Sequence, residues 1–360
     1  MPSQIQTETT ANLNQATSNI GRLDLRGGDD GPRYPQYLPS VEHATFPDWE
    51  EINYVDPGTR GTPDKRHLFL PGSKHKAITP RIGEEIRGVQ LSQLTKEGLD
   101  DLALLAAERG VVIFRDQDFK DIGVEKQLET ARHFGRLHIH PTMPYPKGIP
   151  EMHVVYKEPA AANRFSAIKP ADLQSVSSVV WHSDHTAEQQ PPGYTFFVAL
   201  EVPETGGDTL FVSATEAYKQ LSDGYKQTLE GLKIVHDNTS MIEYAKSKGL
   251  PARFSPQKRS HPLIRTHPAT GEKILWAIGA GEGNGMPRYI EGFKKEESDS
   301  TLRLLNDVLQ RSGDIQMRAT YEPGTVVIWD NRAVGHTPVH DHKGERRHFV
   351  RISAMAETPY

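Results

Sequence analysis

Two side chains that could bind a metal ion lie close together in the segment 181–184, which reads Trp-His-Ser-Asp. In an extended strand, residues i and i+2 point to the same face, so His182 and Asp184 can reach one ion together. A third ligand must come from elsewhere in the chain. Two imidazoles and one carboxylate on one face of an octahedral ion leave three positions open, as in non-haem Fe(II) oxygenases. The short pattern alone is also compatible with polar surface residues at a strand end.

A second group of chemically capable residues lies in the segment 325–354, TVVIWDNRAVGHTPVHDHKGERRHFVRISA. Its pattern predicts an apolar strand, then His336, a loop, and a second strand. Arg347 and Arg351 are four residues apart and share one face of that strand, opposite to Arg346. A guanidinium in an apolar strand needs an anionic partner, and its planar fork suits a carboxylate. The alternative is a surface strand whose basic residues face water, and we adopt it for Arg346.

The elements that position these residues are predicted from apolar runs and their spacing. Runs rich in Val, Ile, Phe and Trp, bounded by Gly, Pro or Asp, predict strands at 110–116, 152–156, 194–202, 208–213, 273–278, 325–331 and 348–354. Apolar residues at three- and four-residue spacing predict helices at 94–110, 126–137, 214–232 and 296–313. Single helices do not regularly separate the strands, which disfavours a doubly wound parallel sheet. We therefore expect a mostly β core, an antiparallel barrel or sandwich, with flanking helices.

Composition limits the kinds of site and partner that the chain can have. The 360 residues include no cysteine, so any metal must be held by His, Asp or Glu. The 42 basic and 47 acidic residues are interspersed and give a net charge of −5, which does not favour nucleic acid as a partner. No apolar run approaches the roughly 20 residues of a membrane helix, and the first residues lack the layout of a secretory signal. We expect a cytoplasmic protein with no membrane partner.

The chain is predicted to have three parts. Residues 1–30 are rich in Gln, Thr, Asn, Ser and Gly and predict a disordered arm, because they can bury too little apolar surface to offset the loss of entropy. Residues 31–77 mix Pro with aromatics, which indicates an extended segment on the surface of a folded body. Residues 78–360 form that body, without an internal repeat or a linker.

Six ordered sequence elements resemble the taurine dioxygenase family of Fe(II)/2-oxoglutarate enzymes, particularly its fungal sulfonate-dioxygenase branch. They are FRDQ, HFGRLHIHP, WHSDHT, PETGGDTLF, HPLIRTHPATGEK, and WDNRAVGH followed by RRHFVRI. The resemblance extends from about residue 75 to residue 358. It implies a double-stranded β-helix (jelly-roll, cupin-like) core that catalyses dioxygenase chemistry with Fe(II), 2-oxoglutarate and dioxygen. It also suggests a homo-oligomer.

The resemblance carries over to five residues of the predicted iron and co-substrate sites. His182, Asp184 and His336 occupy the family's iron-ligand positions. Arg347, eleven residues after His336, corresponds to the arginine that binds the distal carboxylate of 2-oxoglutarate. Thr209 corresponds to a threonine that assists this arginine. The resemblance therefore implies a complete set of metal and co-substrate residues.

The implied substrate site combines matches with departures. His140 and Arg351 match the positions that bind the sulfonate of the substrate. His185 stands where a small or aliphatic residue is usual, and we expect it near the substrate. Met143 and Ser178 replace a tyrosine and an asparagine of taurine-specific members. The resemblance thus implies a small anionic substrate, an alkylsulfonate such as taurine or a relative, with an amino acid or other small carboxylate that is hydroxylated, desaturated or cyclised as the alternative.

Several other patterns favour less specific interpretations. The Gly-rich segment 279–285 either lengthens a turn or reshapes the substrate pocket; a nucleotide-binding loop is disfavoured because no Lys-Ser/Thr pair follows. A zinc hydrolase is disfavoured because no His-Glu-x-x-His helix is present. A non-enzymatic β-barrel that keeps only the anion pocket is a further alternative. Six other histidines are predicted to be structural or solvated: His138, His261, His267, His340, His342 and His348. Of these, His340 and His342 are expected in an exposed loop.

Overall fold

The computed structural model describes residues 31–157, 180–280, 286–342 and 345–360. The predicted arm, residues 1–30, lies outside them. All elements below belong to the unit Gln36–Tyr360, apart from the first residue of the short 3-10 helix η1 (Pro35–Tyr37). No helix in the described ranges is both long and apolar enough to cross a membrane.

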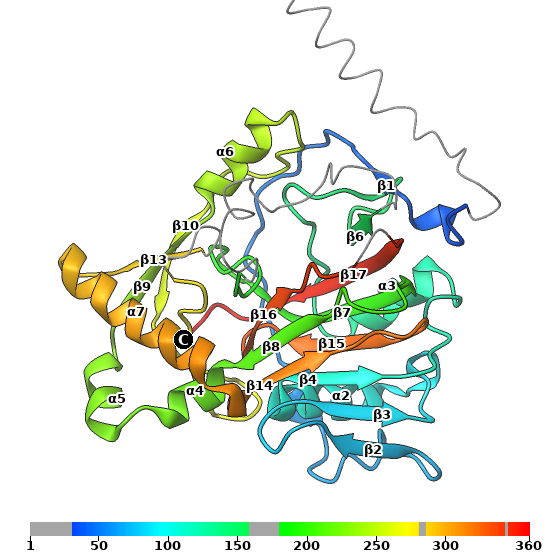
Figure 1. Cartoon of the computed structure of the whole chain (residues 1–360), viewed down its shortest axis with the longest axis horizontal. Coiled ribbons are helices and arrows are strands. Elements are labelled where there is room, and N and C mark those ends of the chain that lie inside the picture. The colour runs from blue at the N-terminus through cyan, green and yellow to red at the C-terminus, as the bar shows by residue number, and fades with distance from the viewer. Residues whose placement is uncertain (1–30, 158–179, 281–285, 343–344) are drawn as a thin grey trace, which may run out of the picture. The chain divides into compact units, whose positions relative to one another are not determined.

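A seven-stranded sheet forms the larger layer of the core, in the order β2-β3-β4-β15-β7-β17-β6 (Figure 1). All neighbouring strands are antiparallel except the parallel pair β3 and β4. The strands are β2 (Lys74–Ala77), β3 (Glu84–Arg87), β4 (Val111–Phe114), β15 (Val326–Asp330), β7 (Pro192–Glu201), β17 (Arg347–Met355) and β6 (Met152–Lys157). Strands β4, β15 and β17 are buried along their whole length, because this sheet is covered on both faces.

A three-stranded sheet packs against one face of the large sheet. Its order is β14-β8-β16, all antiparallel, with β14 (Gln316–Ala319), β8 (Thr209–Ser213) and β16 (Val334–Pro338). An aromatic group joins the layers: Phe197 and Phe349 stack at 4.5 Å, and Trp329 contacts Phe211 of β8 at 5.5 Å. Two facing sheets with flanking helices confirm the mostly β, jelly-roll prediction.

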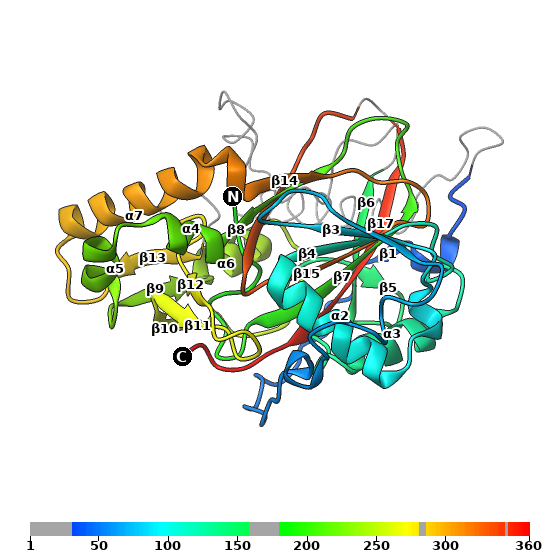
Figure 2. The same ribbon diagram turned by 90° about the horizontal axis from the view of Figure 1, so that it is seen from below.

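Helices α2 (Lys96–Arg109) and α3 (Val124–Arg132) cover the other face of the large sheet (Figure 2). The Thr95 hydroxyl caps α2 by accepting from the Gly98 amide, and Gly110 ends it with a φ of 73°. After α3 the chain turns, and Phe134 packs edge-on against Phe196 at 5.0 Å. The predicted helix 126–137 therefore ends about one turn early.

A second layer of helices and short strands lies beside the sandwich (Figures 1 and 2). It contains the sheet β10-β9-β13, the hairpin β11-β12, the helix α6, and the helices α4, α5 and α7, which contribute to an aliphatic cluster that includes Leu302 and Leu305. The bounds are α4 (Ala214–Gln220), α5 (Asp223–Leu229), β9 (Lys233–Asp237), α6 (Thr239–Ser247), β10 (Lys258–Pro262), β11 (Ile264–Thr266), β12 (Lys273–Leu275), β13 (Pro287–Ile290) and α7 (Lys295–Arg311). The predicted helix 214–232 is two helices, because the Ser222 side chain caps the second.

The segment 36–77 contributes to the folded body through buried contacts. Strand β1 (Pro39–Ser40) pairs with β5 (Tyr145–Pro146), and the 3-10 helix η2 (Pro57–Arg60) packs on α2. Asp56 is 2% exposed, caps η2 and forms an ion pair with Arg332. Two further 3-10 turns are η3 (Leu91–Gln93) and η5 (Gly313–Ile315). The expected division at residue 78 falls directly after β2.

Candidate active site

An antiparallel backbone bridge places the two candidate histidine ligands opposite each other. The His182 amide donates to the His336 carbonyl at 3.0 Å, and the His336 amide donates back at 2.8 Å. Side chains opposed in this way leave the same face of the bridge, and the two rings lie 4.2 Å apart. The carboxylate of Asp184 faces both: Oδ1 is 3.7 Å from His182 Nε2, and Oδ2 is 3.7 Å from His336 Nε2. The three side chains thus converge on one point.

Backbone contacts hold the orientation of these three side chains. His182 Nδ1 lies 3.1 Å from the Val180 carbonyl, which fixes the proton on Nδ1 and leaves the Nε2 lone pair available. The Asn331 side chain binds the backbone of Asp184 twice: its Oδ1 accepts from the amide at 2.7 Å and its Nδ2 donates to the carbonyl at 3.0 Å. Ser183 Oγ donates to the Val334 carbonyl at 3.0 Å. Asn331 directly follows β15 and Val334 begins β16, so the ends of these two strands supply the contacts to Asp184 and Ser183.

The electrostatics of the group favour the protonation states that a metal requires. Burial raises the pKa of Asp184, but nearby Arg351, His336 and His182 outweigh it, so the pKa is well below its usual range. Burial, followed by the proximity of His182, lowers the pKa of His336 to about 3. An ionised carboxylate and neutral imidazoles are the forms that bind metals. The 3.7 Å separations are too long for hydrogen bonds, so the carboxylate does not occupy the Nε2 atoms of His182 and His336, which face the same point and can take an ion. The donor set therefore fits Fe(II).

A cavity of about 250 Å³ opens beside this group. Among the described residues, its lining includes His182, His336 and the permanent cations Lys157, Arg347 and Arg351, but no Asp or Glu. Such a surplus of positive charge in a buried space is favourable only where anions bind.

Arg347 projects from β17 into this cavity and is only 7% exposed. Its Nε donates to the Gly207 carbonyl at 3.1 Å, and its guanidinium lies 4.3 Å from the Phe349 ring centre. Within the described parts of the chain, no carboxylate lies at ion-pair distance from Arg347. Burial lowers the pKa of Arg347, so an anionic ligand would relieve an unfavourable state.

Thr209 lies at the start of β8 and also lines the cavity. Its Oγ1 is 2.6 Å from the hydroxyl of Tyr321, and burial raises the pKa of Tyr321 to about 12. The protonated tyrosine therefore donates to Thr209 Oγ1, and the hydroxyl proton of Thr209 remains available for a different acceptor. Arg347 and Thr209 thus present polar groups to the same cavity.

Arg351 and Met143, two of the predicted substrate residues, line the cavity. Arg351 Nη1 pairs with Asp184, at 3.0 Å from Oδ2 and 3.2 Å from Oδ1. His140 lies behind the lining, with its ring 4.7 Å from that of His153. The backbone amides of Thr142 and Met143 donate to His140 Nδ1 at 3.1 Å each, so its proton resides on Nε2.

The remaining predicted substrate positions differ in placement. His185 is 3% exposed and its ring lies 4.6 Å from that of His140, but it does not line the cavity. Ser178 and residues 281–285 of the Gly-rich segment lie outside the described residues. Whether the glycines reshape the pocket therefore stays a prediction.

Four residues at the cavity were not identified from the sequence. His153 and Lys157 lie on β6 and line the cavity, where they pair in register with Arg351 and Arg347 of β17. The predicted strand run 152–156 included His153 but ended one residue before Lys157. His340 and His342 were assigned to an exposed loop. That prediction was wrong for His342, which is buried, and both line the cavity because the loop folds back over Arg347.

Comparison with known proteins places this site in a family. The family described as "Taurine catabolism dioxygenase TauD, TfdA family" matches residues 74–353. An alpha-ketoglutarate-dependent sulfonate dioxygenase of Saccharomyces cerevisiae is 39% identical over 91% of this chain and 79% of its own length. The alpha-ketoglutarate-dependent dioxygenase cnsP of Penicillium expansum is 38% identical over 94% and 91%. A crystal structure of a taurine dioxygenase from Burkholderia xenovorans superposes with a TM-score of 0.62 at 25% identity, covering 80% of this chain and 91% of that one.

Fold, donor set and comparisons together define a non-haem Fe(II)- and 2-oxoglutarate-dependent dioxygenase that uses molecular oxygen. The chain belongs to the TauD/TfdA family of taurine catabolism dioxygenases.

Proposed function

We propose that this dioxygenase oxidises a small anionic substrate, in the first place an alkylsulfonate. The observation that carries the proposal is the cavity lining, whose described part holds Lys157, Arg347 and Arg351 and no carboxylate. One dianionic co-substrate accounts for part of this charge, and Arg351, although it pairs with Asp184 through Nη1, keeps other N–H groups for an anionic substrate. The sulfonate dioxygenase of Saccharomyces cerevisiae, which shares 39% identity, supports the sulfonate as the anion.

We infer that His182, Asp184 and His336 hold the iron, and that Arg347 and Thr209 hold the distal carboxylate of 2-oxoglutarate. When bound, iron, 2-oxoglutarate and dioxygen supply the oxidising chemistry, with succinate and carbon dioxide as by-products. The contribution of the chain is positional. The Arg347 guanidinium, fixed by Gly207 and stacked on Phe349, presents a preformed fork to the co-substrate.

Arg351 and His140 orient the substrate in this proposal, and His185 and Ser178 stay predicted neighbours of it. Arg351 lies at 3.0 Å from Asp184, so an anion bound to its other N–H groups would sit directly beside the metal ligands. The carbon next to the anionic group would then be nearest the metal. Oxidation at a carbon that bears a sulfonate gives an unstable product that releases sulfite.

A small carboxylate is the second candidate substrate, because a guanidinium fork binds carboxylates as well as sulfonates. Met143 lines the cavity with a flexible apolar side chain, so the pocket does not dictate a polar group at the far end of the substrate. The similarity to cnsP, which shares 38% identity, is compatible with this alternative.

A matched panel of alkylsulfonates, carboxylates and amines of equal chain length tests the proposal. We expect succinate release to be stimulated by one or more alkylsulfonates, with sulfite formed in equal amount. Succinate coupled only to carboxylates would select the alternative, and turnover coupled to no anion would overturn both.

An anaerobic titration with Fe(II) and 2-oxoglutarate tests the assigned ligands separately. Wild type should develop a metal-to-ligand charge-transfer band in the visible range, and His336→Ala should not. The control is His43→Ala, an exposed histidine, which should behave as wild type. A full band in His336→Ala would contradict the ligand assignment.

A further inference from the structure

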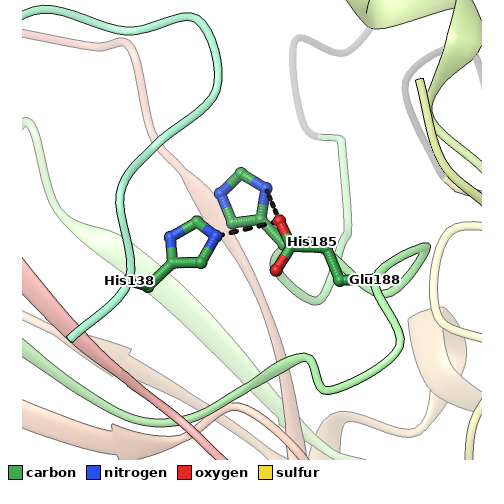
Figure 3. Close-up of side chains that lie close together, drawn as sticks. All are labelled: His138, His185 and Glu188. Atoms are coloured by element: carbon green, nitrogen blue, oxygen red, sulfur yellow. Dashed lines mark hydrogen bonds and ion pairs between the residues drawn. The ribbon is translucent and has the colours of Figure 1, made fainter. Parts of the chain in front are cut away.

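A second group of potential metal ligands lies next to the iron-site residues. His138, His185 and Glu188, here called the His138 cluster, point toward one another from two separate segments (Figure 3). Glu188 Oε1 is 2.9 Å from His138 Nε2 and 3.8 Å from His185 Nδ1. The three residues are 5%, 6% and 3% exposed in the order His138, Glu188, His185, and one donor atom from each lies within 4.8 Å of the others. The cluster is thus a buried His/His/Glu set.

Several polar atoms of the His138 cluster have no hydrogen-bond partner among the described residues. Neither ring nitrogen of His185 has a hydrogen-bond partner among the described residues, and Glu188 Oε2 has none either. Leaving such buried groups unpaired costs about 1–3 kcal/mol each, so native structures rarely keep them. His185 also has a left-handed backbone, with a φ of 51°, which is uncommon for a residue with a Cβ. A strained residue with two unpaired nitrogens indicates that a ligand is needed here.

We propose that His138, His185 and Glu188 bind a divalent cation of the zinc type, distinct from the iron. Two imidazoles and one carboxylate form a three-ligand zinc set that leaves a fourth position for water. Zinc accepts such mixed nitrogen and oxygen donors without a demand for octahedral geometry. The cation would take up the free lone pairs of His185 and Glu188 at once.

Local charge is compatible with a cation at this position. Glu188 supplies a negative charge within the cluster. The guanidinium of Arg351, which lies nearby, is already compensated by Asp184 at 3.0 Å. The net repulsion that the cation would meet is therefore reduced.

The surrounding contacts fix the ligand Glu188 before any ion arrives. Its amide donates to the His185 carbonyl at 3.1 Å, closing a turn, and its own carbonyl lies 3.0 Å from His261 Nε2. Such preorganisation reduces the entropy lost on binding. Because His185 follows Asp184 directly and His138 lies two residues before His140, the cation would tie together the segments that present both residues. Its role is structural support of the active site.

Zinc titration of the full chain after removal of the iron site tests the proposal. In the double variant His182→Ala/His336→Ala, isothermal titration with Zn²⁺ alone should show one ion per chain. Adding His185→Val or Glu188→Gln should weaken that binding at least about tenfold, because losing even an outer-shell partner of a metal ligand costs about 10- to 100-fold in affinity. Adding His43→Ala, an exposed histidine, should leave it unchanged.

Two further readouts separate a lost ligand from a damaged fold. The His185→Val change keeps the His138–Glu188 hydrogen bond, so far-ultraviolet circular dichroism should match the double variant. Zn²⁺ should raise the melting temperature of the double variant but not that of the variant carrying His185→Val. Absence of zinc binding in the double variant, or equal affinity after both ligand changes, would overturn the proposal. The dioxygenase function is not involved, since the double variant already lacks it.

Discussion

Two buried charged clusters flank the same short segment, Asp330–His336, and they differ in how fully their charges are paired. On one side, Arg332 is surrounded by carboxylates: Nη2 lies 2.6 Å and Nε 2.8 Å from Asp330, and Nη1 lies 3.0 Å from Glu357 and also binds Asp56. His267 completes the pairing of Asp330 at 2.8 Å. We call this the Arg332 network. It is closed, and nothing in it faces the cavity.

On the other side, the active site keeps unused binding capacity. Arg347 has no carboxylate at ion-pair distance within the described ranges, and Asp184 faces two imidazoles at 3.7 Å rather than at hydrogen-bond distance. Nearby cations hold the pKa of both Asp330 and Asp184 below the usual range. A lowered pKa therefore does not distinguish a structural carboxylate such as Asp330 from a candidate metal ligand such as Asp184. The two regions differ instead in how many of their charged groups lack a partner.

The largest expected effect is on stability, from Arg332→Met in the Arg332 network. Removing the cation leaves the buried Asp56 and Asp330 without their guanidinium partner and Glu357 with Arg265 alone, which should lower the free energy of unfolding by about 3–5 kcal/mol. Denaturant unfolding followed by fluorescence measures it. Arg303→Met, at an exposed position on α7, should change it by less than about 0.5 kcal/mol. A loss below about 1 kcal/mol for Arg332→Met would show that the ion pairs of the Arg332 network do not contribute to stability as proposed.

Arg347→Gln should show the opposite pattern, with a large effect on binding and a small one on stability. Losing one partner of a desolvated charge pair costs about 2–5 kcal/mol, so the KM for 2-oxoglutarate should rise about 100-fold. The matched control is Arg346→Gln, on the neighbouring residue, whose side chain pairs with Glu201 at 3.4 Å instead of facing the cavity. Steady-state kinetics with varied 2-oxoglutarate should give the control a KM within about twofold of wild type. Equal effects from both changes would refute the assignment of Arg347.

The features of the fold and site that could be predicted from the sequence are those that depend on local patterns. The strand runs and the helices at 94–110 and 296–313 were found because period and capping act over a few residues. The placement of Arg347 and Arg351 beside one cavity followed from the two-residue repeat of a strand, which β17 forms. The same repeat was applied to His182 and Asp184, but the structure has an isolated bridge at His182 and a turn that begins at Asp184.

Features that depend on distant contacts were not predicted. Arg332 owes its role to Asp56, 276 residues away in sequence, so no local pattern identified the Arg332 network. His138 and Glu188 meet across 50 residues, and His138 was assigned to the structural histidines. Helix α6 was missed, since it is short and its N-cap residue Asn238 makes no side-chain capping bond.

Asn331 lies in the segment Asp330–His336 that the two clusters share, and Asn331→Ala should affect the active site. Its side chain binds the backbone of Asp184 at 2.7 and 3.0 Å, so its loss should loosen a candidate iron ligand without removing one. Fe(II) affinity, measured by anaerobic titration, should fall about 10- to 100-fold. Asn306→Ala removes a buried amide that binds the Ala280 carbonyl. It should lower stability but leave iron affinity unchanged. Equal iron affinity in both variants would exclude a positioning role for Asn331.

The smallest expected effect is a difference in pH dependence between the Arg332 network and His261, which contacts the Glu188 backbone beside the His138 cluster. Burial, despite a hydrogen bond to the Glu188 backbone, lowers the pKa of His261 from 6.5 to about 4. The unfolded chain therefore binds the extra proton between these values, and stability falls as the pH drops from 6.5 towards 4, by up to about 1.4 kcal/mol per pH unit. The pKa of Asp330 is lowered instead, so its stabilisation is lost only at lower pH, below its unfolded value of 3.8. Between pH 7 and 5.5, wild type should thus lose about 1 kcal/mol more than His261→Gln in denaturant unfolding. Parallel curves for the two proteins would show that His261 does not titrate in this range.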